Sequence, residues 1–231
     1  MATCEVLRAD VVLCTGPEAS APTVLLLHAG GERRTVWAPV AAALAEAGLT
    51  SVAFDLRGHG ESSGEARVLS EVGADVREML THLRRPVVAV GTSLGGLAAV
   101  AALADPVAAR GVVGLVLVDV VPDPEPARVR SWLDRQGLLA RRRPLIEDIL
   151  GRGPELLETV AGLEIRVLLV RGGPASVVTD EEVARLRGVR PGLAVEVVPE
   201  AGHLVARDAP GELAEVVIRA ARTWTASARV R

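Results

Sequence analysis

The chain has 231 residues and a formal net charge of −3 at pH 7. This length suits one domain with a large core, and the small negative charge argues against nucleic acid or an anionic membrane surface as a partner. Apolar residues make up 49% of the chain and aromatic residues only 2%, so we expect an aliphatic core.

The sequence also argues against membrane insertion, secretion and metal binding. No apolar run is long enough to cross a bilayer, and the first residues have neither the basic region nor the apolar segment of a signal peptide. Cys4 and Cys14 are too few for a disulfide framework, and the four histidines lie among residues that are not metal ligands. We therefore expect a cytoplasmic protein that uses no metal and no other cofactor.

Buried strands and helical patterns alternate along most of the chain. Two short strands are predicted near residues 4–8 and 10–15. Each later strand is a continuous apolar run, which is typical of a parallel sheet buried on both faces. This alternation predicts an α/β protein with a doubly wound sheet. The later strands are predicted at Thr23–His28, Thr50–Asp55, Pro86–Val90, Val112–Asp119, Ile165–Arg171 and Leu193–Val198, and the helices at Val36–Ala47, Leu69–Leu83, Leu94–Ala104, Asp180–Arg187 and Pro210–Thr225.

One segment, residues 121–164, interrupts this alternation. It has no predicted strand but three helices, around residues 126–136, 144–150 and 154–161. It follows the strand that ends at Asp119, so it is inserted at the carboxyl edge of the sheet, where α/β proteins bind ligands. We interpret the chain as a single domain over residues 1–231 with a helical lid at 121–164, above a pocket for a small or medium substrate. Trp132 in the first lid helix is a candidate pocket wall, and a place in the lid's own core is the alternative.

The strand at Pro86–Val90 continues through Gly91-Thr92-Ser93-Leu94-Gly95 directly into a helix. Strand, Gly-x-Ser-x-Gly and helix form the pattern of a nucleophile elbow, in which glycines two places before and after the serine permit a very tight turn. Such a turn exposes the serine hydroxyl, and the N–H of the next residue points toward an oxyanion formed beside it. Ser93 is therefore the candidate nucleophile, and Leu94 supplies one N–H of a candidate oxyanion hole.

Two further loops at the same predicted edge supply partners for Ser93. His203 follows the last predicted strand and precedes the last helix, so it is the candidate general base. Small residues follow His28 at the end of the first long strand, and they allow the N–H of Gly30 to approach the same oxyanion. We interpret His28 itself as structural, and the polar residues of the loop 55–62 as a hydrogen-bond network that fixes a turn.

Together these motifs resemble those of the α/β-hydrolase superfamily. The resemblance covers nearly the whole chain and rests on H-A-G-G with Trp37 after it, D-L-R-G-H-G-E-S, G-T-S-L-G-G, L-V-L-V-D-V-V-P, R-G-G and A-G-H, in that order. It implies a mostly parallel sheet of eight strands, a lid after strand six, and a triad of serine, acid and histidine in that chain order. These motifs are specific for the fold and leave the substrate open.

The chain departs from the family pattern at the acid. Similar proteins carry an aspartate after strand seven, in a sequence like G-G-x-S-D-x-V, and this chain has Ser176 at that position. A serine has no negative charge with which to stabilise an imidazolium, so another carboxylate must serve or the triad lacks its acid. Asp119 is the first candidate, because haloalkane dehalogenases, which use an aspartate nucleophile, take their acid from the corresponding strand end. Asp180, which also fits a helix capping box, and Asp123 are the alternatives.

The leading hypothesis is a serine-dependent acyl hydrolase of the esterase, thioesterase or lactonase type. In this hypothesis Ser93 attacks a carbonyl of a small-molecule substrate, His203 transfers the proton, and Asp119 orients His203. One alternative is a biosynthetic cyclase, aromatase or acyl transferase that uses the same pocket on a natural-product intermediate. The other is a degenerate binding protein without catalysis. The sequence leaves the oligomeric state and the identity of the substrate open.

Overall fold

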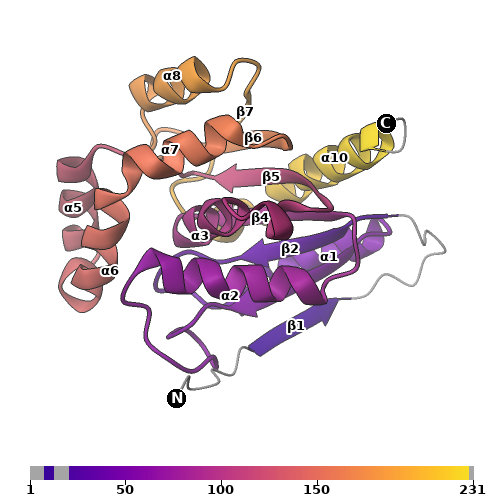
Figure 1. Cartoon of the computed structure of the whole chain (residues 1–231), viewed down its shortest axis with the longest axis horizontal. Helices are drawn as coiled ribbons and strands as arrows, with labels where there is room; N and C mark the ends of the chain where they lie inside the picture. The colour runs from indigo at the N-terminus through magenta and orange to yellow at the C-terminus, as the bar shows by residue number, and fades with distance from the viewer. Residues whose placement is uncertain (1–7, 13–20, 229–231) are drawn as a thin grey trace.

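A seven-stranded sheet forms the centre of the molecule. The computed structural model describes residues 8–12 and 21–228, whose arrangement is shown in Figure 1. The strand order is β1-β3-β2-β4-β5-β6-β7, and every neighbouring pair is parallel except β1 with β3. The predicted α/β class is confirmed, and each predicted apolar run forms one strand of the parallel part. The bounds are β1 (Arg8–Val12), β2 (Thr23–Leu27), β3 (Thr50–Asp55), β4 (Val87–Thr92), β5 (Val112–Val118), β6 (Arg166–Gly172) and β7 (Ala194–Val198).

Alternate strand residues pack into two aliphatic layers, because successive side chains of a strand point to opposite faces. In β2, Leu25 and Leu27 enter one layer and Val24 and Leu26 the other, and all of them are fully buried. Helices α2 and α3 cover the first layer, and α1 and α10 cover the second (Figure 1). The helices outside the lid segment are η1 (Arg34–Trp37), α1 (Ala38–Glu46), α2 (Leu69–His82), α3 (Leu94–Leu103), α4 (Pro106–Ala109), α8 (Asp180–Val189), α9 (Val205–Asp208) and α10 (Pro210–Ala228).

The segment 121–164 is helical throughout most of its length. It contains α5 (Pro126–Arg135), α6 (Leu139–Gly151) and α7 (Gly153–Gly162), close to the three helices that the sequence predicts. In Figure 1, α5 and α6 lie beyond the arrowheads of the parallel strands, at the carboxyl edge of the sheet. This segment therefore stands where a lid is expected.

Some details differ from the expectations. The resemblance implies eight strands, whereas the described residues form seven. The patterns near residues 4–8 and 10–15 predict two strands, and the structure has the single strand β1; the rest of both patterns, with Cys4 and Cys14, lies outside the described residues. The short helices α4 and α9 are not predicted, because four residues are too few to show a helical period.

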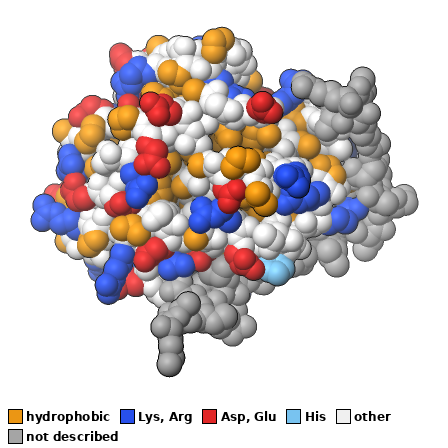
Figure 2. Space-filling model, viewed as in Figure 1, with side chains coloured by type: hydrophobic (Ala, Val, Ile, Leu, Met, Phe, Trp, Pro, Cys, Tyr) orange, Lys and Arg blue, Asp and Glu red, His pale blue; other side chains and the backbone are white. Residues whose placement is uncertain are grey.

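The face of the molecule drawn in Figure 2 carries charges of both signs. On the face shown in Figure 2, arginine and acidic side chains are mixed, so the described residues there form no extended patch of one sign. Over residues 8–12 and 21–228, no helix is both long and apolar enough to cross a membrane.

Polar side chains fix the loop after β3, as the sequence predicts. Asp55 is fully buried and accepts hydrogen bonds from the backbone N–H groups of Arg34 at 2.6 Å and Glu61 at 2.9 Å. His28 at the end of β2 is also fully buried, and its Nε2 accepts from the N–H of Leu56 at 3.0 Å. Burial lowers the pKa of His28 to about 4, so its ring is neutral at pH 7. These contacts tie together the ends of β2 and β3.

Candidate active site

Ser93 lies in a sharp turn between β4 and α3. Its φ of 49° and ψ of −115° lie outside the regions that most residues favour. A Cβ atom at Gly91 would collide with the backbone N of Gly96, and one at Gly95 would collide with the carbonyl oxygen of Leu27. Glycine at both positions thus lets α3 begin directly against β4 and β2. The turn has the geometry of a nucleophile elbow.

Asp119 lies at the neighbouring strand end, directly after β5. It also has a positive φ of 49°, and within the described ranges Ser93 and Asp119 are the only non-glycine residues with this feature. Such conformations cost of order 1–3 kcal/mol each and gather at functional sites. Two of them at adjacent strand ends set this edge of the sheet apart from the other described residues.

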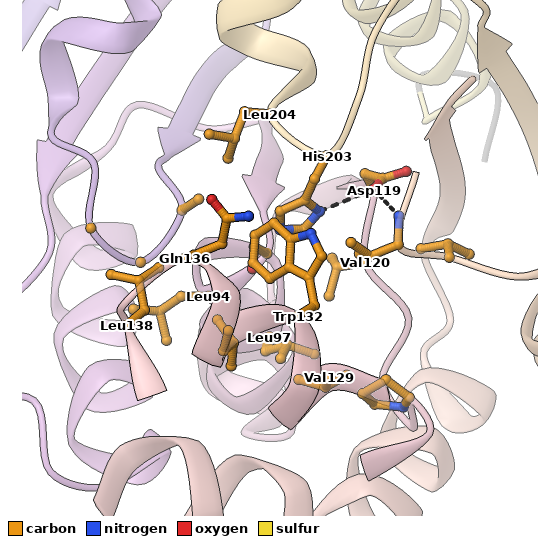
Figure 3. Close-up of a pocket in the computed structure, with 18 of the residues that line it drawn as sticks. Leu94, Leu97, Asp119, Val120, Val129, Trp132, Gln136, Leu138, His203 and Leu204 are labelled. Atoms are coloured by element: carbon orange, nitrogen blue, oxygen red, sulfur yellow. Dashed lines mark hydrogen bonds and ion pairs between the residues drawn. The ribbon is translucent and has the colours of Figure 1, made fainter. Parts of the chain in front are cut away.

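The carboxylate of Asp119 is fully buried and contacts His203. Its Oδ2 lies 3.0 Å from Nδ1 of His203, which is 8% exposed. Oδ1 accepts from the N–H of Gly172 at 2.8 Å and from the hydroxyl of Ser176 at 2.5 Å, and Oδ2 accepts from the N–H of Val177 at 3.2 Å. Because a carboxylate only accepts, Nδ1 of His203 is the donor, and in the neutral ring Nε2 carries the lone pair. Figure 3 shows this pair at the cavity wall.

The two alternative acids lie elsewhere. Asp180 is the first residue of α8, where its exposed carboxylate pairs with Arg171. The side chain of Asp123 lies against Gly153, and its carbonyl accepts from Arg185 at 2.8 Å. Of the three candidate carboxylates, only that of Asp119 is within hydrogen-bond distance of His203 in the described structure.

Ser176, which occupies the position expected for the acid, hydrogen-bonds the carboxylate of Asp119. It lies on the loop after β6, at the position where the resemblance implies an aspartate, and it donates its hydroxyl to Asp119. β5 and β6 are paired neighbours, so the loops at their carboxyl ends meet. The acid that contacts His203 therefore comes from the end of β5 and not from the loop after the neighbouring strand β6. Ser176, on that loop, is one of the hydrogen-bond donors to Asp119.

A cavity of about 680 Å³ opens at this edge of the sheet, between the strand ends and helices α5 and α6. Its volume lies in the range of small-molecule sites. An added Cβ at Gly30 would lie 3.9 Å from the side chain of Leu94, so these two backbone segments are neighbours. The structure brings every site residue proposed from the sequence to the wall of this cavity: Ser93, His203, Asp119, Leu94, Gly30 and Trp132.

Helix α5 covers His203 with an aromatic side chain. The ring centroids of Trp132 and His203 are 4.7 Å apart, and the rings meet edge to face at 75°. Figure 3 shows the indole beside the imidazole, with Val129 and Gln136 on the same helix. Arg128, one turn before Trp132, pairs with the buried Glu182 of α8. Trp132 is thus a wall of the cavity, and an ion pair ties its helix to α8.

Glu32 lines the cavity as well, and sequence reasoning missed it. Its carboxylate accepts from the N–H of Ala29 at 3.3 Å, within the loop that also carries Gly30. Burial raises the pKa of Glu32 above its ordinary value, whereas that hydrogen bond and the charge of Arg207 act in the opposite direction. The only sequence signal is its place directly after His28-Ala29-Gly30-Gly31.

A parallel sheet with an elbow-type turn, a buried histidine–carboxylate pair and an adjoining cavity at its carboxyl edge defines the class of α/β-hydrolases. The chain belongs to the alpha/beta hydrolase family, whose sequence model matches residues 24–216.

Curated relatives and solved structures agree with this assignment. The esterase Rv0045c of Mycobacterium tuberculosis is 30% identical over 252 residues, which cover 86% of this chain and 82% of the esterase. Protein phosphatase methylesterase 1 of Mus musculus is 36% identical over 108 residues, a match that covers 43% of this chain and 28% of that protein. An esterase structure from Thermogutta terrifontis has a TM-score of 0.72 at 21% identity, over 96% of this chain and 94% of that one, and shares the fold.

Proposed function

We propose that this protein is a serine-dependent acyl hydrolase that cleaves an ester-type bond in a small or medium substrate. The observation that carries the proposal is the 3.0 Å contact between the buried Asp119 carboxylate and Nδ1 of His203, in a cavity that Ser93 also lines. Membership of the family and the esterase relative from Mycobacterium tuberculosis support an ester-type bond.

Asp119 holds His203 in the tautomer with hydrogen on Nδ1. Nε2 then accepts the proton of the Ser93 hydroxyl while the serine oxygen attacks the substrate carbonyl. The imidazolium formed in this step lies beside a carboxylate that backbone N–H groups and Ser176 keep in place. It returns the proton to the leaving group, and His203 next deprotonates the water that hydrolyses the acyl-enzyme.

The N–H groups of Leu94 and Gly30 stabilise the oxyanion of each tetrahedral intermediate. Leu94 begins α3, so its N–H belongs to the unpaired donors at a helix N-terminus. Gly30 lies on the neighbouring loop, beside the side chain of Leu94. One such donor is commonly worth a factor of about 10²–10³ in kcat.

Helices α5 and α6 of the segment 121–164 act as the lid of this site. Their residues form the wall of the cavity opposite the strand ends, and Trp132 limits the space above His203. The ordered contacts around Asp119 also argue against the alternative of a degenerate binding protein, because a site without catalysis has no need for a buried, fully bonded carboxylate against a histidine.

Labelling with a fluorophosphonate tests the proposal. This probe reacts with activated serine hydroxyls, and we expect one adduct on the native protein, located at Ser93 by peptide mass spectrometry. The Ser93→Ala variant serves as the control and should remain unlabelled. A native protein without an adduct, or equal labelling of Ser93→Ala, would contradict the proposal.

A further inference from the structure

Arg142 places a positive charge at the wall of the cavity without a carboxylate partner. Elsewhere on that wall Arg128 pairs with Glu182 and Arg207 with Asp208, whereas Arg135 donates to the hydroxyl of Ser131. Arg142 is half-buried, and its Nη2 donates to the carbonyl oxygen of Gly58 at 2.9 Å. Among the described residues, no carboxylate lies within ion-pair distance of this guanidinium. A guanidinium has five N–H donors, so most of them remain available to a ligand.

His59 lines the same cavity and has an unsatisfied nitrogen. It is 6% exposed, its Nδ1 donates to the carbonyl of Arg57 at 2.9 Å, and its buried Nε2 has no hydrogen-bond partner among the described residues. Leaving such a group unpaired costs about 1–3 kcal/mol. His59 follows Gly58, the residue on which Arg142 rests, so the imidazole and the guanidinium are adjacent. Burial, together with the positive charge of Arg142, lowers the pKa of His59.

The local sequence of α6 explains why Arg142 reaches the part of the cavity wall formed by Gly58 and His59, which we call the Arg142–His59 corner. The backbone at Arg142 leaves the helical conformation, with φ −128° and ψ 21°, two residues before Pro144. A proline inside a helix lacks an N–H, and its ring collides with the carbonyl four residues earlier, so the helix kinks there. The kink falls at the residue that contacts Gly58.

The sheet order places this corner on one side of Ser93 and the acid on the other. His59 belongs to the loop after β3, which is separated from β4 by β2 alone. Two strand spacings amount to about 10 Å. Asp119 and Ser176 follow β5 and β6, on the opposite side of β4. A substrate whose carbonyl lies at Ser93 therefore extends toward Arg142 without meeting the acid.

We propose that Arg142 and His59 form a subsite for a carboxylate of the substrate, so that the preferred ester also carries a free acid group. This inference rests on the proposed acyl hydrolase function. A carboxylate matches the planar donor pair of a guanidinium and supplies its missing counter-charge. The same negative charge favours the protonated form of His59, whose Nε2 then donates to the ligand. One ligand group thus satisfies both unpaired features of the corner.

Two esters of equal acyl length and leaving group test the subsite. Mono-para-nitrophenyl adipate ends in a carboxylate, and para-nitrophenyl hexanoate ends in a methyl group. We expect kcat/KM to be at least tenfold higher for the adipate ester, since a charge-assisted contact is gained. The ratio of the two values should fall about tenfold in Arg142→Gln, severalfold in His59→Leu, and less in Arg142→Lys.

The matched control is Arg143→Gln, which removes the same charge from an exposed neighbour outside the cavity wall. Its ratio should stay within twofold of the native value. Hydrolysis of both esters with no preference for adipate, or with the same ratio in Arg142→Gln, overturns the subsite and leaves the hydrolase function standing.

A binding measurement separates the subsite from catalysis. If the protein turns over neither ester and takes no fluorophosphonate label, the proposed function fails, and calorimetric titration of Ser93→Ala with monomethyl and dimethyl adipate still decides the subsite. Tighter binding of the monoacid, lost when Arg142→Gln is added, supports it. Equal binding of the two esters overturns it.

Discussion

Replacing Asp119 by asparagine tests the proposed mechanism with the least change of shape. Asparagine keeps one carbonyl oxygen and exchanges the other for an NH₂ group. The oxygen takes the side of Oδ1, where Gly172 donates at 2.8 Å and Ser176 at 2.5 Å. The NH₂ group then faces Nδ1 of His203 and the N–H of Val177, which are both donors in the native protein.

His203 resolves this conflict by moving its hydrogen from Nδ1 to Nε2. In that tautomer Nε2 cannot take the proton of Ser93, and the corresponding loss in serine hydrolases is about 10⁴ in kcat, or about 5.5 kcal/mol of barrier height. The N–H of Val177 also loses its acceptor, which costs about 1 kcal/mol of folding free energy. We expect a folded, slightly less stable variant that is about 10⁴-fold slower.

Steady-state hydrolysis of a para-nitrophenyl ester measures the effect, and thermal unfolding checks the fold. Asp180→Asn is the control, because this carboxylate is 87% exposed and its ion pair with Arg171 lies outside the cavity. It should change kcat/KM by less than about twofold. The reasoning is refuted if Asp119→Asn keeps more than about a tenth of the native kcat/KM, or if Asp180→Asn loses as much.

Three further predictions follow from single contacts. Ser176→Ala should lower kcat/KM about tenfold by removing a charge-assisted donor, and adding Ser176→Asp to Asp119→Asn should recover at least tenfold in the same assay; no recovery would speak against a relocated acid. Because the pKa of His28 falls from 6.5 in the unfolded chain to about 4 in the folded one, the unfolded state binds more protons below pH 6.5, and the free energy of unfolding should drop by about 2 kcal/mol from pH 7 to pH 5 in urea titrations. A His28→Gln variant with an unchanged pH slope would contradict this. Gly95→Ala, whose Cβ meets the carbonyl of Leu27, should lose more than about 3 kcal/mol in the same titrations, whereas Gly188→Ala in α8, with open space around it, should gain about 0.5–1 kcal/mol.

Most of the fold could be predicted from the sequence because its signals are local. Six continuous apolar runs became the six strands of the parallel part, and the bounds of β3 match the predicted Thr50–Asp55. The long helices α2, α3 and α10 also begin at the predicted residues. The lid helices were found because three helical patterns without a strand stand in one segment. The sequence does not predict α4 and α9, since a helix of four residues is too short to show a helical period of apolar residues.

Some residues of the candidate site can be predicted from their neighbours in the sequence, and others depend on contacts between distant parts of the chain. Ser93 was assigned from the pattern around it, because the closeness of β4 and α3 demands glycine at Gly91 and Gly95. His203 was assigned from its place after the last strand. For the acid, the sequence puts Asp119 at a strand end first and keeps Asp180 and Asp123 as alternatives, because no local pattern shows which carboxylate reaches His203. The catalytic roles of all these residues stay predictions.

The sequence by itself determined the α/β class, the order of its elements, the elbow at Ser93 and the absence of an aspartate at position 176. Each of these features depends on residues that are neighbours in the chain: on the periodicity of apolar side chains, and on the glycines that a tight turn requires. Only the tertiary structure decided that Asp119 meets His203 and that Ser176 donates to Asp119, and only it set Arg142 beside His59. These contacts join residues from 57 to 84 positions apart. They exist because the pairing of β5 with β6 and of β6 with β7, and the kink in α6, bring the loops together.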